Sequence, residues 1–416
     1  MLDYLLIPIS IFLLRFPTIY LGGSRVIFST EILSLIVLGL YFIAIRKKLL
    51  STHVLNLNKE NFLILIFFCL QSLSVVGASN IGDFLQRYVK IIFGILIYIS
   101  VKYYLSKNKN ISYHYLLLAL IFGSSITIAM QLLVFFSPTI YNDLGKLFIY
   151  SNEFNFVQVN SSVGKLLDGT YVETIIPILI FYLTIFRERK NQKIKLIIVS
   201  LISILGFIAV VSNFRYRVLA YIFAILLSFI CFEYKKLSKF ILFAVIIVAF
   251  ITANIFSKNI SGYTVFERVF TPEQGTADTT SVSFRIDMMI ESAKLAFAYP
   301  ITGVGLGNFY NALPNKYKSQ LILRDNVGNQ IYLGALQAGS HNIFFQFLAE
   351  TGILGVLSFI LLILFFVKKD IALVKSNVKY KKPFIASFWT LMIIVQFFPP
   401  TNLAFYTLFF LLRAAI

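Results

Sequence analysis

The sequence predicts an all-α polytopic membrane protein that crosses the bilayer about 12 times, and three observations carry this prediction. Hydrophobic residues make up 58% of the 416 residues and charged residues only 13%, against about 25% charged residues in soluble domains. The mean hydropathy is +0.84. Apolar runs near the length that a spanning helix needs, about 20 residues, recur along the chain. We therefore expect a single integral membrane domain over residues 1–416.

Twelve apolar segments are candidate spanning helices, and the first and last of them are the shortest. In chain order they cover residues 4–20, 27–45, 61–77, 89–105, 113–136, 171–186, 194–212, 217–233, 239–256, 344–367, 383–398 and 402–415. One missed or added helix would place basic connections on both sides of the membrane, so the distribution of charge tests the count.

The basic residues follow the predicted topology. With the N-terminus in the cytoplasm, every even-numbered connection is basic, for example at Arg46-Lys47-Lys48, from Arg187 to Lys195, and at Lys368-Lys369. Lys and Arg are enriched in cytoplasmic loops, so both termini are expected in the cytoplasm. This distribution also accounts for the net charge of +19. Nucleic acid is not an expected partner, because no basic domain stands outside the membrane part.

Two predicted outward connections are long, residues 137–170 and residues 257–343, and the second precedes the tenth span. Loops of this length usually have a function or a structure of their own. From Ser283 to Tyr299 the second loop has helical periodicity, with one face formed by Ile286, Ile290, Ala293 and Phe297. This pattern predicts an amphipathic helix at the membrane surface.

A turn is expected directly after this helix. Pro300 ends the helical pattern, and three alternating glycines follow it, Gly303, Gly305 and Gly307. Because glycine has no side chain to restrict its backbone, the expected turn is flexible.

Three arginines are candidates for binding an anion on the outward face. Arg215 and Arg217 lie in a very short connection, Asn213-Phe214-Arg215-Tyr216-Arg217, and Arg285 lies on the amphipathic helix. A guanidinium presents a planar fork of donors that suits phosphate or pyrophosphate. The simpler interpretation of each arginine alone is a contact with lipid headgroups.

His341 is the candidate general base. Of the three histidines, His53 and His114 fall on or near the predicted cytoplasmic side, so His341 alone faces outward. Ser340 is expected to cap the helix that His341 begins, and the positive end of a helix dipole disfavours the charged imidazolium. A neutral imidazole can accept a proton at pH 7. The alternative is an ordinary interfacial histidine.

A metal ion or another cofactor is not expected. The outward connections contain no Asp-x-Asp pair, no Cys/His cluster and no His-Glu-x-x-His motif. If a phosphate leaving group is involved, arginines must supply the positive charge that a metal would otherwise provide.

The second half of the chain resembles the O-antigen ligase and polymerase superfamily of bacterial envelope proteins. The resemblance runs from Ser283 to Gly355 and lies in three ordered stretches, Ser283-Phe284-Arg285-Ile286-Asp287, Tyr299 to Phe309, and Ser340 to Gly355. It implies a GT-C-like membrane glycosyltransferase in the bacterial inner membrane, with its active site facing the periplasm.

The resemblance also implies an activity and its partners. The donor is a glycan on undecaprenyl pyrophosphate, and the enzyme is an inverting-type glycosyltransferase that works without a metal ion. A polymerase transfers the glycan to another lipid-linked repeat unit, and this is the favoured interpretation, while a ligase transfers it to the lipid A core. The lipid bilayer and a chain-length regulator are the further expected partners.

The family pattern has one arginine after the seventh span, one on the loop helix and one histidine before the tenth span. These positions correspond to Arg215, Arg285 and His341, which are the expected catalytic residues. Arg217 and Asn342 are expected to bind substrate. The family often has Ser-Arg followed by a small residue where this chain has two arginines, so the choice between Arg215 and Arg217 stays open.

A lipid-linked oligosaccharide flippase or another transporter is the alternative from a different functional class, since twelve spans fit it as well. Transporters of this kind usually show two similar halves with broken helices in matching places. The sequence shows no such symmetry, and one long outward loop makes it lopsided.

Overall fold

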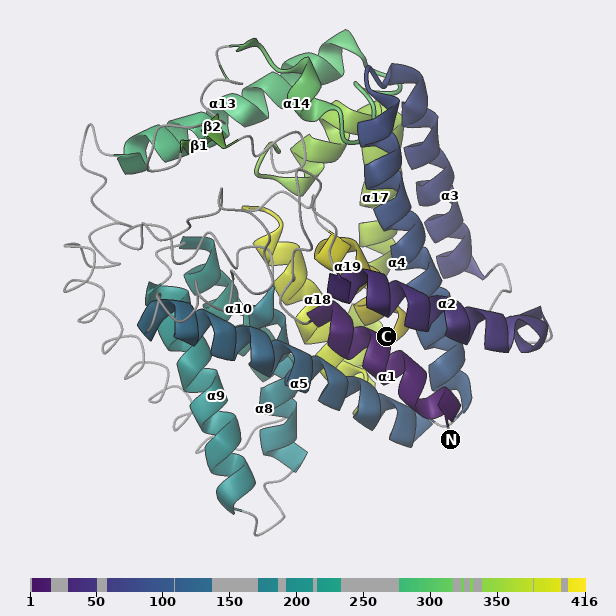
Figure 1. The fold of residues 1–416 in the computed structure, drawn as a ribbon, viewed down its shortest axis with the longest axis vertical. Helices are drawn as coiled ribbons and strands as arrows, with labels where there is room; N and C mark the ends of the chain where they lie inside the picture. The colour runs from purple at the N-terminus through teal and green to yellow at the C-terminus, as the bar shows by residue number, and fades with distance from the viewer. Residues whose placement is uncertain are drawn as a thin grey trace.

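The computed structural model is helical throughout its described part, apart from one pair of two-residue strands (Figure 1). It describes residues 2–15, 29–50, 58–107, 109–136, 171–185, 192–211, 215–232, 277–315, 317, 323–324, 330–331, 339–376, 378–397 and 403–416.

The helices before the second long loop are α1 (Leu2–Arg15), α2 (Ser29–Leu50), α3 (Lys59–Leu73), the 3-10 helix η2 (Ser74–Gly77), α4 (Ile81–Lys107), α5 (Lys109–Phe136), the 3-10 helix η3 (Val172–Ile175), α8 (Ile176–Ile185), α9 (Gln192–Val211) and α10 (Arg215–Cys231). Those in and after it are α13 (Ala277–Ala298), α14 (Phe309–Ala312), α17 (Ile343–Lys375), α18 (Lys382–Ile394) and α19 (Leu403–Ala414). Strands β1 (Leu323–Arg324) and β2 (Gln330–Ile331) pair antiparallel.

Eleven of the twelve predicted spans overlap a described helix, and the ninth, residues 239–256, lies outside the described residues. Within the described part, five helices are long and apolar enough to cross a membrane: Lys59–Gly77, Ile81–Ser106, Ile111–Ala129, Gln192–Ala209 and Ile343–Lys375. The prediction of an all-α polytopic membrane protein is therefore confirmed. The count of about 12 spans and the GT-C-like arrangement stay predictions.

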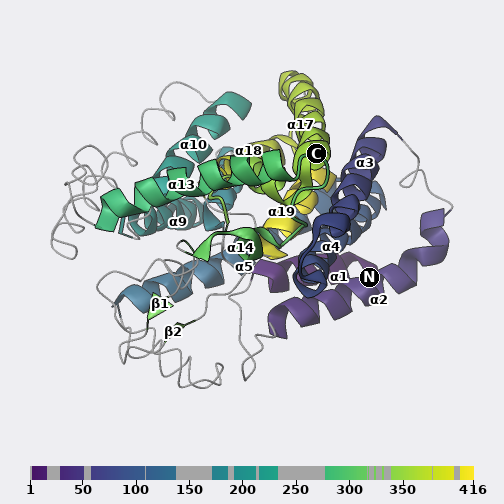
Figure 2. The same ribbon diagram turned by 90° about the horizontal axis from the view of Figure 1, so that it is seen from above.

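The long helices lie side by side. Helix α3 packs against α17, α4 packs against α19, and α10 packs against α18. Figure 1 shows α3, α4 and α17 running along the longest axis of the molecule. Helix α13 packs on α17, and Figure 2 shows it lying across the ends of the helices when they are seen from above. Helix α13 therefore covers the end of the bundle at which α17 begins (Figure 2).

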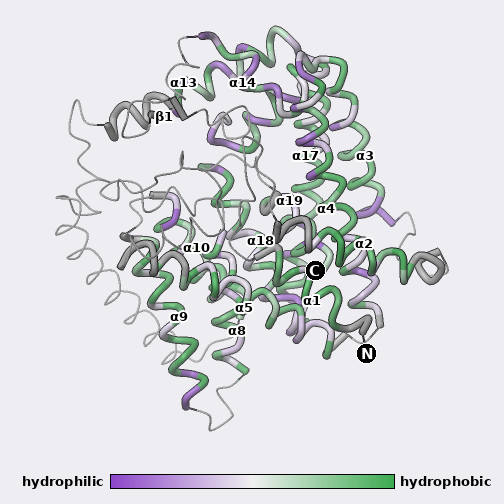
Figure 3. The backbone as a smooth tube through the Cα atoms, in the orientation of Figure 1, coloured by the Kyte–Doolittle hydropathy of each residue, from purple (hydrophilic) through white to green (hydrophobic). Residues whose placement is uncertain are grey.

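Large apolar side chains on the outside of the long helices indicate their solvent. Leu361 and Leu364 of α17, Leu196 of α9 and Ile230 of α10 are all exposed, Ile230 to 70%. Figure 3 shows that α3 and α9 are mainly hydrophobic along their lengths, with hydrophilic residues near one end. A contiguous apolar surface of this kind is costly in water and is solvated by lipid chains in a bilayer.

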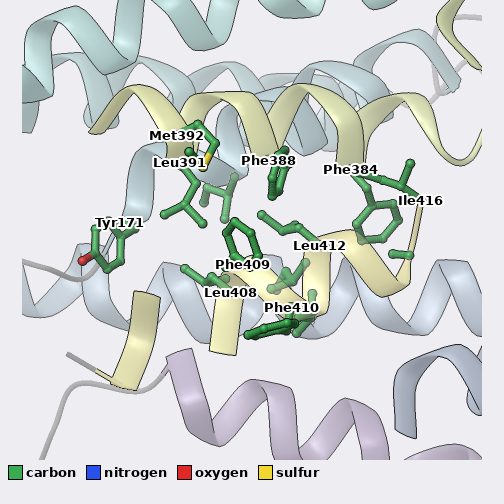
Figure 4. Close-up of a cluster of buried hydrophobic side chains, with 14 of the residues drawn as sticks. Tyr171, Phe384, Phe388, Leu391, Met392, Leu408, Phe409, Phe410, Leu412 and Ile416 are labelled. Atoms are coloured by element: carbon green, nitrogen blue, oxygen red, sulfur yellow. The ribbon is translucent and has the colours of Figure 1, made fainter. Parts of the chain in front are cut away.

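Aromatic side chains fill the core between α18 and α19, as Figure 4 shows. The rings of Phe388 and Phe409 have centroids 5.3 Å apart, and both rings are fully or almost fully buried. Phe366 of α17 meets Phe388 edge to face at 5.8 Å. These contacts bury large areas and fix the helices against one another.

Ion pairs join α3, α17 and α19 at the opposite end from α13, and a hydrogen bond adds α18. The Arg413 guanidinium donates to both carboxylate oxygens of Asp370, at 2.9 and 2.8 Å, and Trp389 donates to the same carboxylate. Lys369 Nζ lies 2.6 Å from Glu60 Oε2. Buried charges in a membrane must be paired, which these contacts achieve. Lys369 and the start of α3, both expected near the cytoplasmic side, therefore lie together.

The turn between α13 and α14 is held rigidly, so the expectation that it is flexible is wrong. The Val304 amide donates to the Ala349 carbonyl oxygen at 2.9 Å, and the Leu306 amide donates to Ser74 Oγ at 3.2 Å. Gly352 has φ 64° and interrupts α17 where the turn touches it. A Cβ added at Gly352 would lie 2.5 Å from the Ile301 carbonyl oxygen. We call the contact of residues 301–308 with η2 and with Gly352 the glycine junction.

Replacing Gly352 by alanine is expected to destabilise the protein, because an L side chain adds strain of about 1–3 kcal/mol at positive φ and also clashes with backbone. The detergent-solubilised variant should unfold several degrees below the unmodified protein in a thermal scan. Gly39→Ala in α2 is the matched control, because a Cβ there meets nothing within 4 Å. Equal unfolding temperatures for Gly352→Ala and Gly39→Ala would refute the junction as a stability element.

Candidate functional site

His341 lies in a tight turn directly before α17. Its φ is 55°, and Tyr171 is the other non-glycine residue of the described part with positive φ. Asn342, not Ser340, caps the helix, because its side-chain oxygen accepts from the amides of Phe344 and Phe345. The expectation that His341 begins the helix is therefore wrong: α17 begins at Ile343. The left-handed backbone turns His341 out of the helix.

Hydrogen bonds on both sides hold this turn. Ser340 Oγ donates to the Asn342 carbonyl at 2.7 Å, and the Ser340 amide donates to Gln346 Oε1 at 2.7 Å. Asn342 Nδ2 donates to Gln396 Oε1 at 3.1 Å, beyond the end of α18. The oxygen and nitrogen of the Asn342 amide thus have partners within the protein. Its predicted contact with substrate stays a prediction, and its observed contacts position His341.

Arg285 of α13 and His341 act on each other electrostatically across the site. Burial is the main cause that lowers the pKa of His341 from 6.5 to about 4, and the positive charge of Arg285 lowers it further. A hydrogen bond with the Phe397 backbone works in the opposite direction. The imidazole is therefore neutral at pH 7, as expected, although burial and Arg285 rather than a helix dipole are the causes.

Helix α13 begins six residues before the predicted helix, at Ala277, and presents two different faces. Met288 and Ser292 are buried, and Met288 packs with Phe309 and Ala349. The face predicted to be apolar points away from the protein, with exposed Ile286, Ile290 and Phe297. This orientation leaves the apolar face free for a membrane surface and turns the other face toward α17.

Arg217 forms a buried ion pair with a partner that sequence reasoning missed. Its Nε lies 2.6 Å from Glu173 Oε1, and both side chains are 3% exposed. Glu173 interrupts an apolar run, which was the available signal. One edge of the Arg217 guanidinium is thus committed to Glu173, and its predicted substrate contact stays a prediction. Arg215 is the first residue of α10, and its side chain lies outside the described part of the structure.

A buried polar chain begins one turn inside α17. Gln346 Nε2 donates to Glu350 Oε1 at 2.6 Å, and Arg87 Nη2 of α4 lies 4.0 Å from the same oxygen. The backbone amides of Gly307 and Phe309 also interact with Glu350. The apolar run around Glu350 marked it in the sequence as an intramembrane charge, but gave no indication of Arg87 or Gln346.

Possible metal ligands and the other two histidines are the remaining candidates for a site. The described residues contain no group of three or more His, Cys, Asp or Glu side chains arranged to hold a metal ion. His114 Nδ1 lies 2.8 Å from the Tyr182 hydroxyl, between α5 and α8. His53 lies outside the described residues.

One comparison with known proteins gives a match. Residues 200–360 match the family model described as O-antigen ligase. This match supports the predicted resemblance to the O-antigen ligase and polymerase superfamily over this segment. The segment contains Arg215, Arg285, His341 and Glu350. No curated protein matches the chain.

The protonation of His341 is testable with diethyl pyrocarbonate, which acylates only the neutral imidazole. Because the pKa of His341 is lowered to about 4, its modification should fall by half near pH 4, not near pH 6.5. The measurement uses a His53→Gln, His114→Gln background, so that only His341 reacts.

In the same background, Arg285→Gln removes a positive charge, so the half-point should rise while burial keeps it below 6.5. Lys294→Gln is the control, since Lys294 lies on the same helix and pairs with Glu291. A shift of equal size in both variants would contradict a specific effect of Arg285.

Proposed function

We propose that this chain, whose residues 200–360 belong to the O-antigen ligase family, is a membrane glycosyltransferase. It transfers a glycan from undecaprenyl pyrophosphate to an acceptor hydroxyl. The observation that carries this proposal is a neutral histidine placed beside an arginine within the matched segment. The histidine can accept a proton from a hydroxyl, and the arginine can stabilise an anionic leaving group.

The reaction is a single displacement. The neutral imidazole of His341 accepts the proton of the acceptor hydroxyl while the hydroxyl oxygen attacks the anomeric carbon of the donor. The bond between that carbon and the pyrophosphate oxygen breaks, and its electron pair leaves with the pyrophosphate. Attack from the side opposite the leaving group inverts the configuration at the anomeric carbon. Arginine side chains supply the positive charge that stabilises the leaving pyrophosphate, so no metal ion is required.

Donor binding would make His341 a stronger base. Without substrate, burial and, to a smaller extent, the charge of Arg285 keep the pKa of His341 low. When the pyrophosphate binds Arg285, its negative charge offsets that of the guanidinium, so the pKa of His341 rises toward its ordinary value. The base becomes effective when the leaving group is in place.

Arg215 is the better candidate for the second pyrophosphate ligand. Arg217 is buried against Glu173 and neutralises that acid. Arg215 begins α10, two residues earlier, and is the arginine at the position that the family pattern indicates.

The proposed location is the bacterial inner membrane, with His341 on the periplasmic face and both termini in the cytoplasm. The supporting observation is that His341 precedes α17 while Lys369, in a predicted cytoplasmic group, lies near its other end. The bilayer and a chain-length regulator are the further proposed partners.

Two acceptors fit the same chemistry. We favour polymerisation onto a lipid-linked repeat unit, and the description of the matched family favours ligation to the lipid A core. The glycan ladder of a deletion strain separates the two. Loss of a polymerase leaves one repeat on the core, and loss of a ligase leaves none. An unchanged ladder would refute both.

Transport of the lipid-linked glycan is tested by reconstitution. Purified protein in vesicles, supplied with donor and acceptor on the same side, should release undecaprenyl pyrophosphate. Release at the rate of empty vesicles would remove the glycosyltransferase proposal and leave a flippase as the surviving interpretation.

The catalytic assignment predicts the effect of two substitutions. His341→Ala removes the base and should lower the transfer rate by about 10²–10⁴-fold. Arg285→Ala should lower it as well, because the leaving group loses positive charge. Transfer is measured as product per mole of protein recovered in membranes. Normal ladders from both variants at normal protein levels would disprove the mechanism.

The choice between the two arginines has its own test. Arg217→Ala should destabilise the protein by about 3–5 kcal/mol, because it leaves Glu173 buried and unpaired. The double variant Glu173→Met, Arg217→Met removes both charges and should keep transfer activity, whereas Arg215→Met should abolish it. An inactive double variant at normal protein level, together with an active Arg215→Met, would reverse the assignment.

A further inference from the structure

We propose that Gln346 and Glu350 are positioning residues that hold the Ser340–Asn342 turn, and with it the His341 imidazole, in the geometry required for transfer. The inference rests on the proposed role of His341 as the general base. It adds two residues inside the membrane-spanning helix to the functional site, together with Arg87, the cation that faces Glu350.

The starting point is the backbone of His341. A φ of 55° is a left-handed conformation that only a small minority of non-glycine residues adopt. Such a conformation persists only where surrounding contacts determine it. The turn therefore depends on its hydrogen bonds, and a change in them would release the imidazole into other orientations.

The bond from Ser340 to Gln346 is the innermost of these contacts. The Ser340 amide donates to Gln346 Oε1 at 2.7 Å, while Ser340 is 0% and Gln346 1% exposed. No water replaces a partner that is lost at such depth, so an amide without an acceptor there is costly. Gln346 thus fixes the residue directly before His341.

Glu350 holds the other end of the Gln346 amide. The Ser340 amide can only donate, so the oxygen of Gln346 faces it, and the amide nitrogen of Gln346 donates to Glu350 Oε1. Glu350 is itself buried among donors. Gln346, the Gly307 and Phe309 amides and the Arg87 guanidinium all present donors or positive charge to it.

The glycine junction brings part of this donor set to Glu350. Gly303 lies so close to α17 that an added Cβ would meet the Thr351 amide nitrogen at 2.5 Å, and Val304 donates to Ala349 at 2.9 Å. These contacts place the Gly307 and Phe309 amides beside the carboxylate. A chain of contacts thus runs from the junction through Glu350 and Gln346 to the turn that contains His341.

The test exchanges the two side chains. In the double variant Gln346→Glu, Glu350→Gln, a carboxylate at position 346 can accept from the Ser340 amide and from the amide at position 350. The hydrogen-bond pattern at the turn is therefore restored, while the carboxylate moves from position 350 to position 346. In Gln346→Glu alone two acids meet, and in Glu350→Gln alone the amide of Gln346 can reverse. Each single variant should lower kcat by about tenfold or more, with the KM for the donor little changed. The double variant should recover most of the lost kcat.

A pH measurement separates positioning from mere stability. The exchange moves a negative charge one turn closer to His341, so the pH of half-modification by diethyl pyrocarbonate should rise in the double variant. Ser358→Ala is the matched control, because it removes a buried hydrogen bond of α17 that stays within the helix. It should leave kcat and the half-point unchanged.

The possible outcomes are distinct. If His341→Ala retains activity, the proposed function fails and takes this inference with it. If His341→Ala is inactive but the double variant is no better than the single variants, only the positioning role fails. Should the single variants not accumulate in membranes, Gln346→Met takes their place, since it leaves the Ser340 amide without its acceptor and adds no charge. An unchanged kcat in Gln346→Met would overturn the inference.

Discussion

The close approach of backbone to backbone at the glycine junction is the constraint on which the site depends. Gly303 and Gly352 leave no room for a Cβ, so the loop between α13 and α14 lies directly on α17. This contact interrupts α17 at Gly352, sets α13 across its first turns, and supplies amides to Glu350. Close packing of this kind has low compressibility and therefore holds position well. A loop thereby fixes groups as rigidly as a helix would.

Charge is distributed according to the cost of burying it in lipid. At one end, Arg413 is neutralised by Asp370, and Lys369 by Glu60. Toward the other end, Arg217 is neutralised by Glu173, and Arg87 faces Glu350. These pairs join helices that are distant in sequence, so each satisfies a buried charge and fixes a helix position. Arg285 differs in that its charge acts on a neutral imidazole. A cation beside a neutral base is a suitable arrangement for an anionic group that leaves as a proton is removed.

Three features of the fold give His341 its properties. Its backbone conformation comes from the turn before α17, its burial from the packing around that turn, and its electrostatic neighbour from α13. Helix α13 therefore packs beside the site and also contributes to its chemistry. The outer face of the same helix carries exposed Ile286, Ile290 and Phe297, which suits contact with lipid. One helix thus connects the membrane surface to the histidine.

The sequence by itself determined the helical segments, because runs of about 20 apolar residues have few alternatives in a bilayer. It also determined the candidates Arg285 and His341, since few charged or titratable groups stand at outward positions. Only the tertiary structure decided their partners. The pairing of Arg217 with Glu173 and the chain from Arg87 to Ser340 join residues far apart in the sequence, which no local pattern encodes. The glycines illustrate the same limit. Alternating glycines predict freedom in an isolated chain, whereas here the missing side chains admit a neighbouring backbone and remove that freedom.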